Sequence, residues 1–179
     1  KDMSQFEAQK GVNVLYKKNE TNDIFTLIYV FNTGTENDPA LNLAFDYLSY
    51  LGTDKMSAEQ IASEMYAIAC SFGLSAGTNQ SWIEISGLSE NMGKAMEIVE
   101  GLIAGAQPNE EILQNLKGDM IKSRADAKLN QSRCFGALQR YMIYGSDFIR
   151  RTTLTDPALQ GLTSEQLLAK IGDLMGKQH

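Results

Sequence analysis

Imidazole and thiol side chains, which serve as general bases, nucleophiles and metal ligands, are scarce in this sequence. One histidine, His179, stands at the last position, and the cysteines are Cys70 and Cys134. A zinc site needs several imidazole or thiolate ligands close together, and a Ser-His-Asp triad needs a histidine within the fold. The histidine content therefore argues against both. The cysteines lack metal-ligand spacing, so we expect small buried residues, bridged only if the geometry allows a disulfide.

An independent enzyme acting on a small molecule is a further hypothesis, with Asp46 or Cys70 as its reactive group. Such chemistry needs a base, a nucleophile and an orienting group close together. The sequence does not group three residues of these types, so this hypothesis has little support.

The overall composition narrows the classes of partner. The chain has 179 residues, 43% of them hydrophobic, and a net charge of −6, which suits one globular domain, residues 1–179, with a substantial core. An acidic chain without a lysine or arginine cluster is not expected to bind nucleic acid or an anionic membrane. Its apolar stretches fall short of the roughly 20 residues that span a bilayer. We therefore expect a soluble protein of unknown compartment.

The start of the sequence, Lys1-Asp2-Met3, has no pattern of a targeting segment. We expect the chain to be a fragment of a longer protein with several domains.

Strand patterns occur in two regions. Residues 12–17 alternate in part, and residues 24–31 are β-branched, aromatic and apolar on both faces, with turn residues between the two segments. We expect a hairpin, with 24–31 as a central strand covered on both faces. Leu74 to Thr78 and Ser81 to Ser86 predict a second hairpin.

Helix signals fill the rest of the chain. Asp38 and Pro39 predict the start of an apolar helix over 40–51, and capping boxes begin at Ser57 and Thr163. The other predicted helices span 91–105, 108–129, with Lys117, Asp119, Lys122 and Arg124 on its exposed side, and 132–144. The order of elements predicts an α+β fold of two layers, a largely antiparallel sheet with helices packed on one face.

The segment from Asn32-Thr33-Gly34 through Tyr50-Leu51-Gly52-Thr53 and Lys55-Met56-Ser57 to Gly73 resembles the family of zinc peptidases that includes pitrilysin, insulin-degrading enzyme and mitochondrial processing peptidase. In active members the first helix carries a His-x-x-Glu-His motif shortly before a Gly-Thr turn. Two imidazoles at i and i+4 hold zinc there, and the glutamate activates the bound water. The resemblance implies a metallopeptidase-like domain of the processing-peptidase type.

Counting back from Gly52 places this motif on Leu43-Ala44-Phe45-Asp46-Tyr47. The ligand positions then hold Leu43 and Tyr47, and the third ligand, a glutamate in active members, falls near Lys122. Asp46 matches the general base in charge, although a solvated charge on an apolar helix is the simpler interpretation. All three ligands are missing by this count, so we expect no metal and no cofactor in this domain.

The resemblance implies a non-catalytic domain, which is not an enzyme on its own and helps to form a substrate chamber. Zinc and peptide hydrolysis would belong to a catalytic peptidase domain, in the same chain or in a partner subunit, with a peptide as substrate. The alternative is a structural or assembly module of the same fold with no role in proteolysis, like the related core subunits of respiratory complexes.

Other features have both a functional and a structural interpretation. Residues 73–79 fall where active members pair with a peptide, yet a plain edge strand explains them as well. The arginines could contact substrate carboxylates or a neighbouring domain, or lie on solvated helix faces. The remaining large side chains fit core packing better than ligand stacking. The arginines are Arg133, Arg140, Arg150 and Arg151. The large side chains expected in the core are Tyr29, Phe31, Phe45, Trp82, Met92, Met96, Met120 and Met142.

Overall fold

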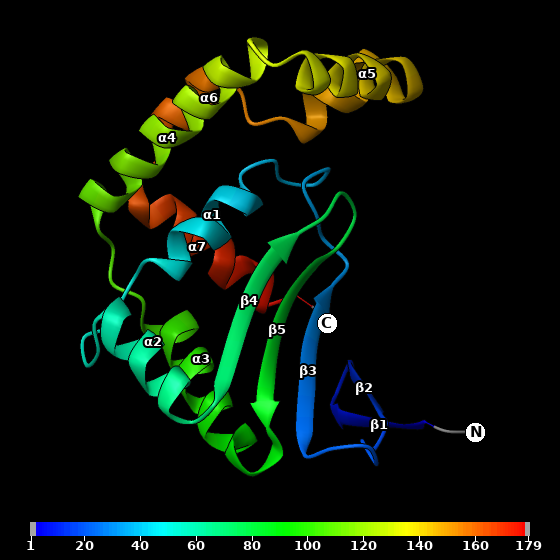
Figure 1. The fold of residues 1–179 in the computed structure, drawn as a ribbon, viewed down its shortest axis with the longest axis vertical. Coiled ribbons are helices and arrows are strands. Elements are labelled where there is room, and N and C mark those ends of the chain that lie inside the picture. Colours follow the sequence, from blue (N-terminus) through cyan, green and yellow to red (C-terminus); the bar gives the residue numbers. More distant parts are fainter. Residues whose placement is uncertain (1–2, 178–179) are drawn as a thin grey trace.

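The computed structural model describes residues 3–177; His179 and the first two residues lie outside this range. Its main layer is a three-stranded antiparallel sheet in the order β3-β5-β4, with helices against one face (Figure 1). The sheet strands are β3 (Ile24–Phe31), β4 (Cys70–Ala76) and β5 (Ser81–Leu88). The helices are α1 (Leu41–Ser49), α2 (Ala58–Ala67), α3 (Met92–Gly105), α4 (Glu110–Lys128), α5 (Gln131–Thr152), α6 (Asp156–Gly161) and α7 (Ser164–Met175), with a short 3-10 turn, Ser89–Asn91, before α3.

Strand β3 lies at an edge of the sheet, where it pairs with β5 alone. Its side chains alternate: Ile24, Ile28 and Val30 are exposed, while Phe25 and Leu27 point to the helical layer. The prediction of a strand covered on both faces is therefore wrong for the described residues. An apolar run does not distinguish a central strand from an edge strand, because that depends on pairing with distant segments.

The predicted hairpin of residues 12–17 with 24–31 is also wrong. A strand that the sequence analysis missed, β1 (Ser4–Gln9), pairs instead with β2 (Val12–Tyr16). These two strands form a separate two-stranded sheet beside the start of β3 (Figure 1). The predicted hairpin of β4 with β5 is confirmed, with Leu74 opposite Ile83.

Helix α1 occupies the middle of the core, in contact with α7 and β4. It begins at Leu41 with Ala40 as its N-cap, two residues later than Asp38 suggested. Asp38 instead accepts a hydrogen bond from the Ala40 backbone N–H and pairs with Lys170 of α7. The carboxylate thus still organises the start of the helix, while it also joins α1 to α7.

Local sequence signals set the ends of several helices. The capping boxes at Ser57 and Thr163 both form, each with the glutamine three residues on. Asn109 caps α4 and Asn130 caps α5, each by accepting a backbone N–H. Gly145 has the left-handed backbone (φ 78°, ψ 173°) that favours glycine, and it divides α5 into two helical halves.

Helices α4, α5 and α6 extend from the body as an arm that curves over one end of the sheet (Figure 1). The base of the arm is held by Glu110 of α4, whose carboxylate accepts hydrogen bonds from the backbone N–H (3.2 Å) and the hydroxyl (2.6 Å) of Ser164. The arm and the body thus enclose a concave side of the molecule.

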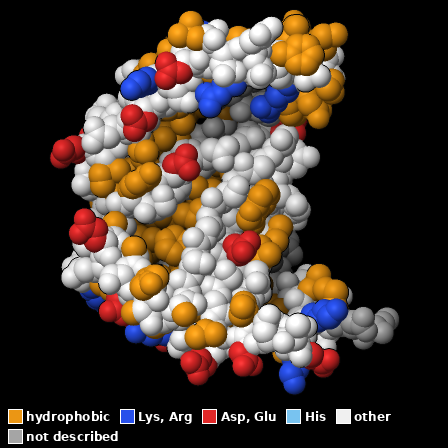
Figure 2. Space-filling view, in the orientation of Figure 1, with side chains coloured by type: hydrophobic (Ala, Val, Ile, Leu, Met, Phe, Trp, Pro, Cys, Tyr) orange, Lys and Arg blue, Asp and Glu red, His pale blue; other side chains and the backbone are white. Residues whose placement is uncertain are grey.

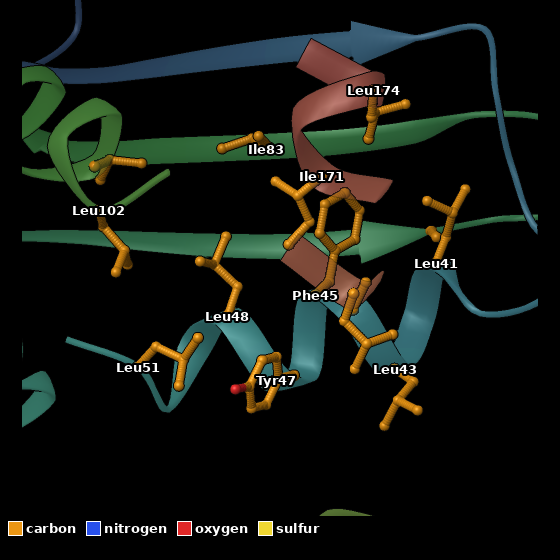
Figure 3. Close-up of a cluster of buried hydrophobic side chains, with 14 of the residues drawn as sticks. Leu41, Leu43, Phe45, Tyr47, Leu48, Leu51, Ile83, Leu102, Ile171 and Leu174 are labelled. Carbon is orange, nitrogen blue, oxygen red and sulfur yellow. The ribbon is translucent and has the colours of Figure 1, made fainter. Parts of the chain in front are cut away.

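The apolar core lies between the sheet and helices α1, α2, α3 and α7. Its members include Leu43, Phe45, Tyr47, Leu48, Ile83, Ile85, Leu102 and Ile171 (Figure 3). The predicted α+β architecture with helices on one face of an antiparallel sheet is confirmed. Across residues 3–177, the structure contains no helix both long and apolar enough to cross a membrane.

Candidate functional site

The two positions that the sequence resemblance assigns to zinc-binding histidines lie inside the core. Leu43 is 1% exposed and Tyr47 is fully buried, both on α1 (Figure 3). Their four-residue spacing puts them on one helix face, as a ligand pair requires. That face packs against apolar neighbours and is closed to solvent. Both side chains belong to the hydrophobic core.

The Tyr47 hydroxyl joins α1 to the start of α4. It accepts a hydrogen bond from the Asn109 backbone N–H at 2.6 Å and donates one to the Asn109 carbonyl at 3.1 Å. A buried phenol needs such partners, because an unpaired polar group in a core is costly. Here the hydroxyl satisfies both backbone groups of the α4 N-cap residue. Tyr47 is a structural anchor.

Asp46, the residue in the general-base position, lies on the exposed side of α1. Although the carboxylate reaches solvent, the surrounding protein partly desolvates it and raises its pKa above the ordinary aspartate value. A catalytic role would require a metal-bound water or another reacting group beside it. The neighbouring ligand positions, Leu43 and Tyr47, supply no imidazole to hold such a group.

Lys122 lies on the exposed side of α4, where it lines a shallow groove with Asp119, Ser123 and Asp126. It therefore does not share the buried environment of Leu43 and Tyr47. Of the three positions that the resemblance assigns to metal ligands, Leu43 and Tyr47 are buried and Lys122 is exposed.

The cation that α4 does bury is Lys117, which is 3% exposed. Its ammonium donates to the carbonyls of Leu162 at 2.6 Å and Gln160 at 3.1 Å, at the end of α6. The prediction that Lys117 lies on the exposed side is wrong, because these carbonyls at a helix end offer a buried ammonium two acceptors. Arg124, also expected outside, is only half exposed and binds the Leu154 carbonyl and Asp156.

The donor set at the motif positions does not fit zinc. Structural and catalytic zinc sites use imidazole, thiolate or carboxylate ligands, whereas the positions hold a leucine, a phenol already bonded to backbone, and an exposed lysine. Among residues 3–177, no cluster of three or more histidine, cysteine, aspartate or glutamate side chains is arranged to hold a metal ion. Cys70 is buried and Cys134 exposed, both as free thiols, so burial was predicted correctly only for Cys70.

A cleft of about 460 Å³ separates the arm from the loops at the end of the sheet. Its walls come from Glu36, from Thr78 and Asn79 in the β4–β5 turn, and from Arg140, Tyr144 and Phe148 of α5. Figure 2 shows lysine and arginine side chains on the side of the arm that faces the hollow. The cleft thus combines a cation, two aromatic rings and hydrogen-bonding groups.

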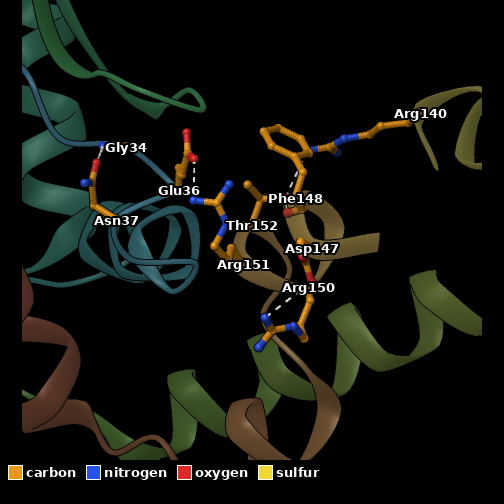
Figure 4. A network of polar contacts seen from close by, with 9 residues as sticks. All are labelled: Gly34, Glu36, Asn37, Arg140, Asp147, Phe148, Arg150, Arg151 and Thr152. Carbon is orange, nitrogen blue, oxygen red and sulfur yellow. Dashed lines mark hydrogen bonds and ion pairs between the residues drawn. The ribbon is translucent and has the colours of Figure 1, made fainter. Parts of the chain in front are cut away.

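The cation of the cleft, the Arg140 guanidinium, lies over an aromatic ring. The Arg140 guanidinium lies 5.5 Å from the centroid of the Phe148 ring (Figure 4). Tyr144 stacks on the same ring, with the two centroids 4.7 Å apart. Arg140 also donates to the Thr152 hydroxyl at 3.4 Å. A guanidinium over an aromatic face keeps edge N–H groups for a carboxylate or carbonyl ligand.

The other arginines have different surroundings. Arg151 pairs with Glu36 at 2.7 Å and joins the arm to the loop after β3, while Arg150 pairs with Asp147 on its own helix (Figure 4). Arg133 lines the groove that also contains Lys122. Of the four arginines, only Arg140 lines the cleft. Sequence analysis could not select it with Tyr144 and Phe148, because the break at Gly145 interrupts the helical periodicity.

Strand β4 lies at the other edge of the sheet, as one interpretation of residues 73–79 required. The backbone N–H of Ala76, at its end, donates to the Asn42 side chain of α1 at 3.3 Å. Pairing of this edge with a peptide stays a prediction.

Two residues predicted to lie in the core are exposed. Trp82 is 37% exposed on the outer face of the sheet, and Met142 is 76% exposed on α5. The prediction is confirmed for Phe31 and Phe45, which are buried. Tyr29 is half-buried, and its hydroxyl donates to Glu100 of α3 at 2.8 Å.

Comparison with solved structures relates this geometry to known proteins. The fold matches the peptidase M16 inactive domain from Pseudomonas fluorescens with a TM-score of 0.80 at 18% identity over 94% of the chain. It matches the periplasmic protease PqqL from Escherichia coli with a TM-score of 0.79 at 17% identity over 97%. It matches the ferredoxin protease FusC, solved in complex with Arabidopsis ferredoxin, with a TM-score of 0.78 at 12% identity over 97%.

At these identities the likeness establishes the fold, which is that of the M16 peptidase domains. The resemblance inferred from the sequence is confirmed at this level. The chain spans 20% of the length of PqqL and FusC and 42% of the Pseudomonas protein. A scan against protein-family models and a search of curated proteins found no match.

Proposed function

We propose that this chain, with the fold of the M16 peptidase domains, is a non-catalytic domain of a zinc metallopeptidase. It forms one wall of a substrate chamber, and a separate zinc-bearing domain, in the same chain or in a partner subunit, hydrolyses the peptide. The observation that carries the proposal is the burial in the core of Leu43 and Tyr47, the residues at the positions that the resemblance assigns to the ligand pair. The likeness to an inactive M16 domain supports it.

The concave side suits the role of a chamber wall. The cleft between arm and sheet is open to solvent, and its Arg140, Asn79 and Thr78 side chains offer hydrogen-bond partners for an extended backbone. The aromatic rings of Tyr144 and Phe148 supply apolar contact for side chains. Such a surface binds a peptide without a nucleophile or a metal.

The first test uses the purified chain alone. We expect no stoichiometric zinc by elemental analysis and no cleavage of an unstructured fluorogenic peptide, because the ligand positions supply no imidazole. Zinc retained near one equivalent per chain after purification without chelators would refute the proposal.

The second test concerns the role in proteolysis. An intact His-x-x-Glu-His motif is sought in the flanking coding sequence and in neighbouring genes, and that zinc-bearing domain is assayed with and without this chain. We expect hydrolysis to fall at least about tenfold in kcat/KM when this chain is absent. Equal activity without it, or the lack of such a motif in both places, would favour the assembly module instead.

A matched pair of arginine variants tests the cleft in the active assembly. Arg140→Ala removes the cleft cation, whereas Arg133→Ala removes an exposed arginine from another groove of the same helix. If Arg140 holds substrate equally in the ground and transition states, its loss raises KM and leaves kcat unchanged. Arg133→Ala should match the unaltered assembly. Equal effects of the two variants would exclude the cleft as the binding surface.

A further inference from the structure

The first half of α5 carries an apolar stripe on the side away from the cleft. The stripe begins at Phe135 and continues with Leu138, Tyr141 and Met142, which lie three, six and seven residues after Phe135 and therefore on one helix face. Their exposed fractions are 59%, 53%, 54% and 76%. We call these four residues the α5 stripe.

The opposite face of the same helix already has a role. Arg140 and Tyr144 point to the cleft, where Tyr144 stacks on Phe148 and Arg140 lies over the same ring. Because Arg140 and Tyr144 line the cleft, the α5 stripe, on the opposite side of the helix, points away from it. Figure 2 shows hydrophobic side chains gathered over the outer end of the arm. Within the part of the chain that the structure describes, none of the residues of α5 is buried.

An amphipathic helix gains most of its stability in a protein from covering its apolar face. An exposed, contiguous group of large apolar side chains is typical of an interaction surface. We propose that the α5 stripe is the interface through which two copies of this chain form a symmetric dimer.

The stripe has the self-complementarity that a two-fold interface requires. It contains no charged residue, so two copies can meet without repulsion. Leu138 lies near its centre, between Phe135 on one side and Tyr141 and Met142 on the other. In an antiparallel crossing at Leu138, Phe135 of one copy packs against Tyr141 of the other. Arg133 and Arg140 stay on the far side of each helix.

The exposed area of the α5 stripe supplies the larger part of what a dimer needs, and its rim can supply the rest. A large aromatic side chain has about 150–250 Å² of surface, so the four side chains of the α5 stripe expose on the order of 500 Å². A standard interface buries roughly 800 Å² per partner. Leu129, which is 88% exposed where α4 meets α5, and the polar side chains of Gln131 and Gln139 can supply the remaining area as a rim.

The experiment measures the mass of the purified chain by light scattering after size exclusion, with reductant present so that the exposed Cys134 cannot cross-link copies. At concentrations of about 100 µM we expect a dimer, with a mass twice the 19.8 kDa of one chain. Leu138→Glu should weaken the dimer at least about 100-fold, because two carboxylates would face each other in an apolar contact.

Two controls separate this interface from misfolding and from other contacts. Ile143→Glu adds the same charge to a more exposed site, since Ile143 is 72% exposed and Leu138 is 53% exposed. Ile143 lies about 100° round the helix from Met142, so this variant should leave the dimer intact. An equimolar mixture of Leu138→Glu and Leu138→Lys should form a mixed dimer, since opposite charges then meet at the crossing. Circular dichroism checks that each variant keeps its helix content.

Three results would overturn the proposal: an unaltered chain that stays monomeric at this concentration, a dimer that survives Leu138→Glu, or equal loss in Ile143→Glu. A monomer would mean that a different domain, or solvent, covers the α5 stripe. The outcome is independent of the proposed peptidase role, because the assay uses neither zinc nor peptide.

Discussion

Replacing Tyr47 by phenylalanine would remove one hydroxyl from the interior and test its role as an anchor. The aromatic ring of Tyr47 is fully buried, and its hydroxyl exchanges two hydrogen bonds with the backbone of Asn109. Phenylalanine keeps the ring and creates almost no cavity. The change therefore isolates the contribution of the two hydrogen bonds between α1 and the start of α4.

The expected loss follows from these two bonds. Each net intramolecular hydrogen bond contributes about 0.5–1.5 kcal/mol. Asn109 is itself exposed, so water can reach its freed backbone groups in part. We expect the free energy of unfolding to fall by about 1–2 kcal/mol. For a chain of this size, the Tm should then drop by roughly 2–8 °C.

The measurement is equilibrium unfolding in urea, followed by circular dichroism. Tyr66→Phe is the control, because Tyr66 is 86% exposed on α2 and loses the same atom in solvent; it should change stability by less than about 0.5 kcal/mol. Hydrogen exchange adds a local readout. The Asn109 amide, which donates to Tyr47, should lose protection in Tyr47→Phe alone.

A loss in Tyr47→Phe no larger than in Tyr66→Phe would refute the reasoning. It would mean that the hydroxyl is interchangeable with water, and that burial of the ring alone explains the residue. Unchanged protection of the Asn109 amide would lead to the same conclusion.

Three further predictions concern the pH dependence of stability and the backbone. A hydrogen bond from Ser164 lowers the pKa of Glu110, so its stabilising effect is present above the ordinary glutamate range and is lost as pH falls through the folded-state pKa; Glu110→Gln should lower the Tm at neutral pH but not in acid. Desolvation raises the pKa of Asp46, so its ionised form is disfavoured in the folded state above that pKa and the penalty disappears as pH falls; Asp46→Asn should raise the Tm at neutral pH, and the two proteins should converge in acid. A Cβ at Gly34 would lie 2.3 Å from the Thr78 carbonyl oxygen, whereas one at Gly101 in α3 meets open space; urea titration should show a loss of about 1–3 kcal/mol for Gly34→Ala and a gain of about 0.5–1 kcal/mol for Gly101→Ala. Equal shifts for the two glycine variants, or a Tm difference independent of pH for either carboxylate, would contradict these expectations.

Much of the fold could be predicted because its signals are local. The capping boxes at Ser57 and Thr163 and the break at Gly145 depend on residues within a few positions of each other. The β4–β5 hairpin likewise depends on a short turn. These interactions form in the same way whatever packs around them.

The burial of individual side chains could not be predicted with the same success. Lys117 can be buried because two carbonyls more than forty positions away, those of Gln160 and Leu162, accept hydrogen bonds from its ammonium group. Trp82 and Met142 are exposed because no described element covers that face of the sheet or of α5. Periodicity shows which residues share a face, but it does not show which face another element covers.

For the candidate site too, some features follow from the sequence and others only from the tertiary structure. The sequence alone determined that the motif positions hold no imidazole, because the identity of a side chain decides which atoms it can offer to a metal. Only the tertiary structure decided that Leu43 and Tyr47 lie within the core and that Arg140, Tyr144 and Phe148 share a cleft with the β4–β5 turn. Contacts between distant segments depend on how the arm folds back over the sheet, and that depends on ion pairs and hydrogen bonds such as those of Glu36 with Arg151 and Lys117 with Leu162.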